Sequence, residues 1–439
     1  MAVRLVLTLV PLLLLGVHYP WRGASGAWWT LDLALYPDDV RQNVSNLLLN
    51  QTSGLGLTDY RYNLGGGGVG VTTWDRAPET PYVSDGVYNW SADAAGTYYL
   101  KEAALQGVPV LTLFVNSAPI TMTSNNQSCG GDLVTDRIPA YVQYLTDVVS
   151  HWKSEGVEFT HVSPMNEPDD TFGSCNQEGM QVVPQQRAEV VTTLAASLKA
   201  AGLSTQVISD ESSDTILGGN CHHLYDFASA ATQQEVFEYG RNLSGGVPTW
   251  FTEICCYNAA NSNDSDNPLA TLTYSSQYDP TMLSGLRMAH IVGIIHLCED
   301  SHWDWWTALS NEIGCTLSSN ATCWDGIQSS GLLYYDPDYS SSQNYDIKVT
   351  KRFSVLKHFT KGAPVGSIRP YSIVALNAQW NTSSITLSGG GTFELTQPVA
   401  MYRTSVTEDY AEVQVPTLSA NGSLVVDAPE MSIFTLFFQ

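Results

Sequence analysis

Positive charge is scarce in this sequence of 439 residues, which carries 19 lysines and arginines against 43 aspartates and glutamates. The formal net charge of −24 argues against the basic surfaces through which proteins bind nucleic acids or anionic membranes. The apolar run Leu5–Leu15 is too short to cross a bilayer, which takes about 20 residues. We therefore expect neither a nucleic-acid partner nor a membrane span.

Motifs for metals and nucleotides are lacking as well. None of the eight cysteines forms a Cys-x-x-Cys pair, and His222-His223 has no further ligand at zinc-site spacing. The glycine run 65–68 lacks the Gly-Lys-Ser/Thr ending of a phosphate-binding loop, so we interpret it as flexible backbone near a substrate. We expect no metal and no cofactor.

The N-terminus is typical of a secreted protein. Arg4 precedes the apolar run, and small residues follow it, which predicts a signal peptide over residues 1–22. In an exported chain the cysteines are expected to form disulfides. Nine Asn-x-Ser/Thr sequons predict a glycoprotein; they begin at Asn43, Asn50, Asn89, Asn126, Asn242, Asn263, Asn320, Asn381 and Asn421. The sequence does not determine the oligomeric state.

Apolar runs with strand character alternate with helical apolar periods over residues 23–361. This alternation predicts an α/β fold, a parallel (β/α)8 TIM barrel. We expect strands at 23–29, 59–63, 108–115, 159–167, 206–209, 221–225, 247–254 and 302–307, and helices at 40–51, 92–106, 138–152, 184–201, 231–239, 282–297 and 347–359. Over residues 362–439 short alternating runs are separated by Asn, Gly and Ser turns, which predicts an antiparallel β-sandwich side domain.

Two of the expected strands end in a glutamate. The run 159–168 closes with Asn166-Glu167-Pro168, and the run 247–254 carries Glu253 near its end. The C-terminal ends of the strands are where barrel enzymes keep their chemistry. Two carboxylates there suit the acid/base and nucleophile pair of glycoside hydrolysis, so Glu167 and Glu253 are the candidate catalytic residues.

The motifs that carry these residues resemble glycoside hydrolase family 30, and most closely its fungal endo-β-1,6-galactanase-like branch. The resemblance covers nearly the whole chain and rests on segments 23–29, 54–63, 163–168, 250–253 and 302–309. It implies a retaining glycosidase with Glu167 as acid/base and Glu253 as nucleophile, their carboxyls about 5–5.5 Å apart. The implied partner is a polysaccharide, and the galactanase-like branch implies the β-1,6-galactan of arabinogalactan.

The resemblance also implies supporting roles. Asn166 matches the residue that binds the sugar 2-hydroxyl, and Arg61 an arginine beneath the nucleophile. His223 and Tyr225 match a His-x-Tyr pair on strand six, and Trp306 matches the floor of the subsite for the cleaved sugar. The further substrate-binding candidates near strand ends are Trp29, Asn63 and Asn116.

Other readings remain open. The same family fold acts on xylan, β-1,6-glucan or a glucosylated lipid, and the loops that decide between them are not readable from sequence. A secreted glycan-binding protein without activity is an alternative of another class, although both glutamates and Asn166 are intact.

Several local expectations follow. We expect disulfides Cys129–Cys175 and Cys315–Cys323; the partners of the other four cysteines stay open. Nine residues, 212–220, separate Glu211 from Cys221, fewer than the about 10–12 of a parallel crossover, so we expect barrel helix five to be absent or vestigial. Strand six should still pair in place through His223 and Tyr225. For the short connection we favour a misread gene boundary over local compensation. The family's side-domain strand before residue 23 is either missing here or partly replaced by residues 5–17, and cleavage after Ala27 would remove the first barrel strand.

Overall fold

The computed structural model describes residues 21–209, 211–213, 221–223, 249–255, 279–297, 301–311, 330–362, 372–389 and 395–438, with a few single positions between 235 and 246. Several expectations fall wholly or largely outside these residues: the signal segment, the connection over 214–220, Tyr225, the helix over 231–239, the sequons at Asn263 and Asn320, and the Cys315–Cys323 pair.

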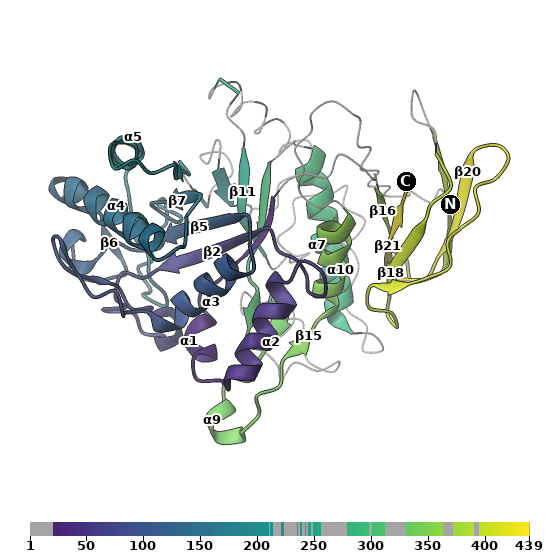
Figure 1. Ribbon diagram of the computed structural model, residues 1–439, viewed down its shortest axis with the longest axis horizontal. Helices are drawn as coiled ribbons and strands as arrows, with labels where there is room; N and C mark the ends of the chain where they lie inside the picture. The colour runs from purple at the N-terminus through teal and green to yellow at the C-terminus, as the bar shows by residue number, and fades with distance from the viewer. Residues whose placement is uncertain are drawn as a thin grey trace.

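Eight parallel strands form the barrel sheet, in the order β10-β11-β12-β1-β2-β5-β7-β9 (Figure 1). The order follows the sequence once around the ring, as a (β/α)8 barrel requires. At the seam, the His223 N–H donates to the carbonyl of Ser212 at 3.0 Å, so strand six lies beside strand five as expected. The strands are β1 Trp21–Ser25, β2 Asp59–Leu64, β5 Val110–Val115, β7 His161–Ser163, β9 Gln206–Val207, β10 Cys221–His223, β11 Trp250–Ile254 and β12 His302–Trp305.

Helices cover the outside of this sheet, close to where the sequence placed them. In α4, Tyr141, Leu145 and Trp152 lie on the buried face, as the periodicity predicts. Gly156 follows α4 with φ 85°, a conformation that suits glycine and ends the helix. The helices are α1 Thr30–Leu33, α2 Asp38–Leu49, α3 Ala94–Leu105, α4 Ile138–Ser154, α5 Pro184–Ala200, α7 Pro280–Leu297, α9 Tyr339–Ser342 and α10 Lys351–Gly362.

One helix boundary differs from expectation. The helix expected from residue 347 begins at Lys351, because Lys348–Val349 forms strand β15 and pairs with β14, Leu333–Tyr334. The remaining short elements are β3 Tyr82–Ser84, β4 Val87–Tyr88, β6 Gly131–Asp132, β8 Met180–Gln181, β13 Leu309–Ser310 and the 3-10 turns Trp74–Arg76, Ile120–Met122 and Thr135–Arg137.

The C-terminal region is the expected antiparallel sandwich. One sheet has the order β16-β21-β18-β19 and the other pairs β17 with β20. Inward residues such as Ile385, Leu387 and Leu424 form a core of their own between the sheets. The strands are β16 Ser372–Asn377, β17 Ser383–Ser388, β18 Ala400–Thr404, β19 Ala411–Glu412, β20 Ser423–Ala428 and β21 Ser432–Phe437.

Helix α10 joins the sandwich to the barrel (Figure 1). Its buried His358 makes hydrogen bonds to Thr435 at 2.8 Å and Thr404 at 2.9 Å, one from each ring nitrogen. Val374 and Ile433 of the sandwich belong to the barrel's hydrophobic core. We propose bounds of 23–361 for the barrel and 362–439 for the side domain. Within the described residues no helix is both long and apolar enough to cross a membrane.

The disulfide Cys129–Cys175 is confirmed, with its Cα atoms 5.3 Å apart. It joins the loop after β5 to the loop after β7, both at the end of the barrel where Glu167 lies. Cys255 is also disulfide-bonded, a pairing that the sequence left open.

Replacing both Cys129 and Cys175 by serine should lower stability substantially. The bridge closes a separation of 46 residues, for which the loss of chain entropy in the unfolded state amounts to about 4 kcal/mol. We expect a lower melting temperature by calorimetry for the double variant. An unchanged melting temperature would contradict this account, and reduction of the wild type gives an independent comparison.

Buried ionisable groups make stability depend on pH. Burial raises the pKa of Glu178 to about 8. Burial alone would lower the pKa of His302, but Asp304 and Asp59 raise it to about 10. Both groups hold a proton in the fold at pH values where the unfolded chain has released it. Their stabilisation is therefore lost as pH rises: for Glu178 from about 4.5 to 8, and for His302 from about 6.5 to 10.

Two histidines contribute to the pH dependence of stability with the opposite sign. Burial lowers the pKa of His161 to about 4 and that of His358 to about 3, and the resulting stabilisation is present at high pH. It is lost as pH falls below about 6.5, so between pH 6.5 and 8 the groups with a raised pKa, Glu178 and His302 among them, set the pH dependence of stability. We expect the free energy of unfolding to fall there by up to roughly 1.4 kcal/mol per pH unit for each group. Melting temperatures measured across this range test the sign, and Glu178→Gln should flatten the slope. A rise in stability from pH 6.5 to 8 would contradict it.

Candidate active site

Arg61 lies at the centre of the C-terminal end of the barrel. Its side chain is fully buried, and one nitrogen, Nη1, donates to Glu253 Oε2 at 2.6 Å. The other, Nη2, donates to Asn166 Oδ1 and to Glu211 Oε1, both at 2.8 Å. The guanidinium lies over the Phe114 ring at 3.7 Å. Charge-assisted hydrogen bonds in a buried setting fix the orientation of the guanidinium. Arg61 therefore links Glu253 of β11 with Asn166 after β7 and Glu211 after β9.

The main chain fixes the position of Glu167. Its N–H donates to the carbonyl of Glu211 at 2.8 Å, and that of Asn166 to the carbonyl of Val115 at 2.9 Å. Glu167 has φ 46°, a left-handed conformation that is uncommon for a residue with a side chain. Neighbouring strands on both sides thus hold it in a conformation that an isolated chain would disfavour.

His223 links the catalytic candidates. Its Nδ1 lies 3.0 Å from Glu167 Oε1 and 3.7 Å from Glu253 Oε1, and its Nε2 lies 4.0 Å from Glu211 Oε1. Oxygens of Glu167 and Glu253 lie within 4.8 Å of each other. The site therefore brings a third carboxylate, Glu211, within reach of the same imidazole.

The two candidate catalytic carboxyls sit in different electrostatic surroundings. Burial raises the pKa of Glu167, the His223 hydrogen bond opposes the rise, and the charge of Glu253 adds to it. Glu253 by contrast faces the fixed charge of Arg61. Burial alone would lower the pKa of His223, but Glu253 and Glu167 raise it. These surroundings favour the protonated form of Glu167 and the ionised form of Glu253.

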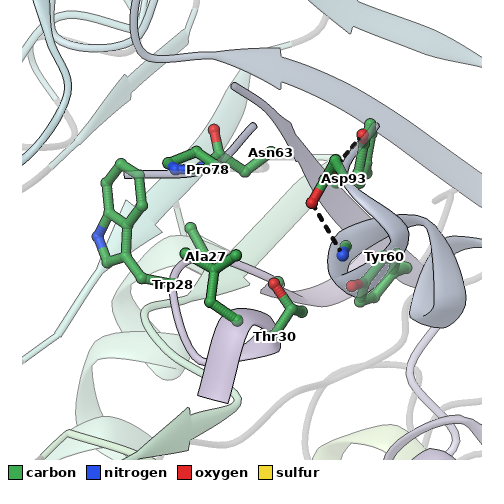
Figure 2. A pocket seen from close by; sticks show the side chains of 11 residues that line it. Ala27, Trp28, Thr30, Tyr60, Asn63, Pro78 and Asp93 are labelled. Atoms are coloured by element: carbon green, nitrogen blue, oxygen red, sulfur yellow. Dashed lines mark hydrogen bonds between the residues drawn. The ribbon is translucent and has the colours of Figure 1, made fainter. Parts of the chain in front are cut away.

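Aromatic residues border two pockets beside this site. Trp28 meets Trp306 edge to face with ring centroids 6.3 Å apart. Both line an open pocket, together with Trp29, Asp75, Arg76 and Tyr335. In the second pocket, Figure 2 shows Trp28 on one side and Tyr60 and Asp93 on the opposite side. Faces of tryptophan suit the apolar faces of sugar rings.

A family comparison can now be set beside this geometry. The model for O-glycosyl hydrolase family 30 matches residues 25–244, just over half of the chain. The chain belongs to this family. The match includes the segments that carry Arg61, Asn166 and Glu167.

Solved structures share the fold over almost the full length. A conserved exported protein from Bacteroides fragilis matches with a TM-score of 0.75 at 18% identity, over 96% of this chain and 98% of its own. The catalytic domain of family 30 xylanase C from Talaromyces cellulolyticus matches at 0.66 and 21% identity, over 96% and 97%. An endo-β-1,6-glucanase matches at 0.65 and 16% identity, over 100% and 95%. At these identities the likeness concerns the fold.

The structure of this family 30 chain brings most of the expected site residues together. Arg61, Asn166, Glu167, His223 and Glu253 form one hydrogen-bonded and ion-paired group. The remaining substrate-binding candidates are not part of this group. Asn116 donates to Asn63 Oδ1 at 2.9 Å, Trp306 lines the open pocket, Trp29 packs on Tyr99 with centroids 4.6 Å apart, and Tyr225 is outside the described residues.

Glu211 is the member of the group that sequence reasoning did not include. It follows β9 closely, so the signal used for Glu167 and Glu253, a carboxylate at the end of a barrel strand, also pointed to it. Its side chain is fully buried, which is rare for a glutamate that has no ion-pair partner, and Arg61 supplies that partner.

The glycine run is held in place, where flexibility was expected. The Glu178 carboxyl group accepts the N–H of Gly66 at 3.0 Å and that of Gly68 at 2.8 Å. A β-carbon on Gly66 would lie 2.9 Å from the Ser117 carbonyl oxygen, so a side chain does not fit. Glycine serves here to bring two active-site loops close together.

Two groups of the described residues place three potential metal ligands within 4.8 Å: Glu167, His223, Glu253 and, deeper in the barrel, Asp59, His302, Asp304. In the deeper group, His302 Nε2 lies 3.0 Å from Asp59 and 2.8 Å from Asp304. In both groups a hydrogen bond already joins the imidazole to a carboxylate. Their chemistry is that of ion pairs, and the expectation of no metal remains a prediction.

Proposed function

We propose that this protein is a secreted, retaining endo-glycosidase that cleaves a β-linked polysaccharide, and that its substrate is the β-1,6-galactan of arabinogalactan. The observation that carries the proposal is the pair of carboxyls, Glu167 and Glu253, with oxygens within 4.8 Å of each other. Retaining enzymes keep their carboxyls about 5–5.5 Å apart, whereas inverting enzymes leave room for a water, at about 6.5–9.5 Å.

In the first step Glu253 attacks the anomeric carbon while Glu167 gives its proton to the glycosidic oxygen, which leaves as a hydroxyl group. Ion pairing with Arg61 keeps Glu253 ionised, and burial keeps Glu167 protonated. Asn166, held through its oxygen by Arg61, has its amide nitrogen available for the sugar 2-hydroxyl. That bond strengthens as positive charge develops at the anomeric carbon.

In the second step a water attacks the glycosyl–enzyme ester from the side that the leaving group vacated. Glu167, now ionised, takes the water's proton, and Glu253 leaves as a carboxylate. Both residues thus return to their starting forms. The hydrogen bond between Glu167 and His223, at 3.0 Å, lowers the pKa of Glu167 and so favours the transfer of its proton to the leaving group in the first step.

Secretion and glycosylation are supported by where the sequons lie. Seven of their asparagines fall in the described part of the chain, and none of the seven is buried: Asn43, Asn50, Asn89, Asn126, Asn242, Asn381 and Asn421. Mass spectrometry after enzymatic removal of N-glycans from the secreted protein tests this part directly.

The substrate is tested with a panel of β-1,6-galactan, xylan, β-1,6-glucan and a glucosylated lipid. Xylan and β-1,6-glucan are included because two proteins with this fold are a xylanase and an endo-β-1,6-glucanase. Product sizing separates internal cleavage from release of single sugars, and proton NMR of the first product gives its anomeric configuration. We expect oligosaccharides of β-configuration from galactan. Products of inverted configuration would sink the two-step mechanism, and an intact panel would favour a glycan-binding protein.

A further inference from the structure

Glu211 lies between the segment that carries Glu167 and the strand that carries His223. It forms an isolated parallel bridge with Asn166, and its carbonyl accepts the Glu167 N–H at 2.8 Å. The next residue, Ser212, accepts the His223 N–H at 3.0 Å. The main chain at 211–212 therefore joins the acid/base segment to the strand that carries His223.

The side chain of Glu211 is fully buried and is satisfied on both oxygens. Oε1 accepts from Arg61 Nη2 at 2.8 Å, and Oε2 accepts the hydroxyl of Ser163. The charged or titratable groups that face this region are Arg61 from β2, Glu167 after β7, His223 from β10, Glu253 from β11 and Asp304 from β12.

The guanidinium of Arg61 contacts both Glu211 and Glu253. A guanidinium prefers a bidentate pair with one carboxylate. Here its two Nη groups point to different carboxylates, and Nη2 also donates to Asn166. Glu211 is therefore a second anion in contact with the guanidinium, on its Nη2 side.

We propose that Glu211 is a positioning residue for both catalytic glutamates. Its carbonyl accepts the main-chain N–H of Glu167 and so positions that residue. Its carboxylate competes with Glu253 for Arg61, so that Glu253 stays ionised but is held less tightly and can attack. This inference rests on the proposed function for its kinetic consequences, although its geometric consequence can be measured without any substrate.

The kinetic test is Glu211→Gln, which keeps the size of the side chain and its main-chain contacts and removes the charge. We expect kcat to fall about 100-fold, the size of effect that a misplaced reacting group produces, with KM within about threefold of wild type. The acid limb of the kcat/KM profile should move to lower pH, because Arg61 then acts undivided on Glu253. A purely structural defect would lower activity without that displacement.

Two companion variants separate charge from geometry. Glu211→Asp keeps the charge, so its acid limb should stay near that of wild type even where kcat is reduced. Ser163→Ala removes the hydroxyl that donates to Oε2 but leaves the ion pair with Arg61, and kcat should stay within about threefold of wild type. If Glu211→Gln matches wild type in kcat and in pH profile, the proposal is overturned.

A crystal structure of Glu211→Gln decides the geometric claim. We expect Arg61 to turn so that both Nη groups bond Glu253, with loss of the Asn166 contact. An Arg61 that still bonds both Asn166 and Glu253 as in the wild type would overturn the proposal whatever the substrate is. Failure of the proposed function looks different: the wild type then cleaves no glycan of the panel, and the crystal structure alone judges Glu211.

Discussion

Replacing Glu253 by glutamine is expected to abolish turnover, with kcat lower by about 10⁴-fold or more, because an amide cannot form the covalent ester. The fold should survive, since the amide oxygen can still accept from Arg61 Nη1. Initial rates on the substrate that the wild type cleaves measure the effect. Glu189→Gln, at an exposed position of α5, is the matched control and should retain wild-type kcat.

Glu167→Ala should lose activity in a different way. An aryl glycoside with a good leaving group needs little help from a general acid, so the first step should proceed and the second should limit the rate. Added azide fits the space left by the side chain and attacks the ester, so the rate should recover in part with a glycosyl azide as product. Equal rescue of Glu253 and Glu167 variants would mean that the two roles are wrongly assigned.

The sequence located Glu167 and Glu253, the candidate catalytic glutamates, because their signal is local. Both lie where an apolar strand stops, and the C-terminal ends of parallel strands meet at one end of a barrel. The helix boundaries of α4 and α5 were equally predictable, since an apolar stripe starts and ends within each segment. The order of the barrel strands was predictable too, because alternating strands and helices place successive strands side by side around a parallel barrel.

The contacts among the glutamates were not predictable, because they depend on residues far apart in sequence. Arg61 and Glu211 are 150 positions apart, and only closure of the barrel brings them within 2.8 Å. Periodicity says which residues point inward but not which of them meet. The pairing of Lys348–Val349 with β14 likewise overrode the helical pattern there, since a strand partner outweighs local preference.

Replacing Arg61 by methionine is expected to cost both stability and activity. Methionine has a similar length and no charge, so Glu211 and Glu253 would face each other's charge inside the barrel without their shared cation. Removal of one partner from a buried ion pair costs about 3–5 kcal/mol, most of it from the uncompensated charge left behind. The free energy of unfolding measured in denaturant gives this difference. Arg41→Met, which removes the exposed pair with Asp38, is the control and should cost at most about 1 kcal/mol.

The cause of that loss can be identified from its pH dependence and from a second substitution. Without Arg61 the buried carboxyls are relieved by protonation, so the variant should lose less stability at pH 5 than at pH 8. Arg61→Met combined with Glu211→Gln removes one of the two unpaired charges, and should recover part of the stability but none of the activity, because Asn166 and Glu253 still lack their donor. If the double variant is as unstable as the sum of the single ones, Arg61 stabilises the barrel by packing on Phe114 and not by its charge.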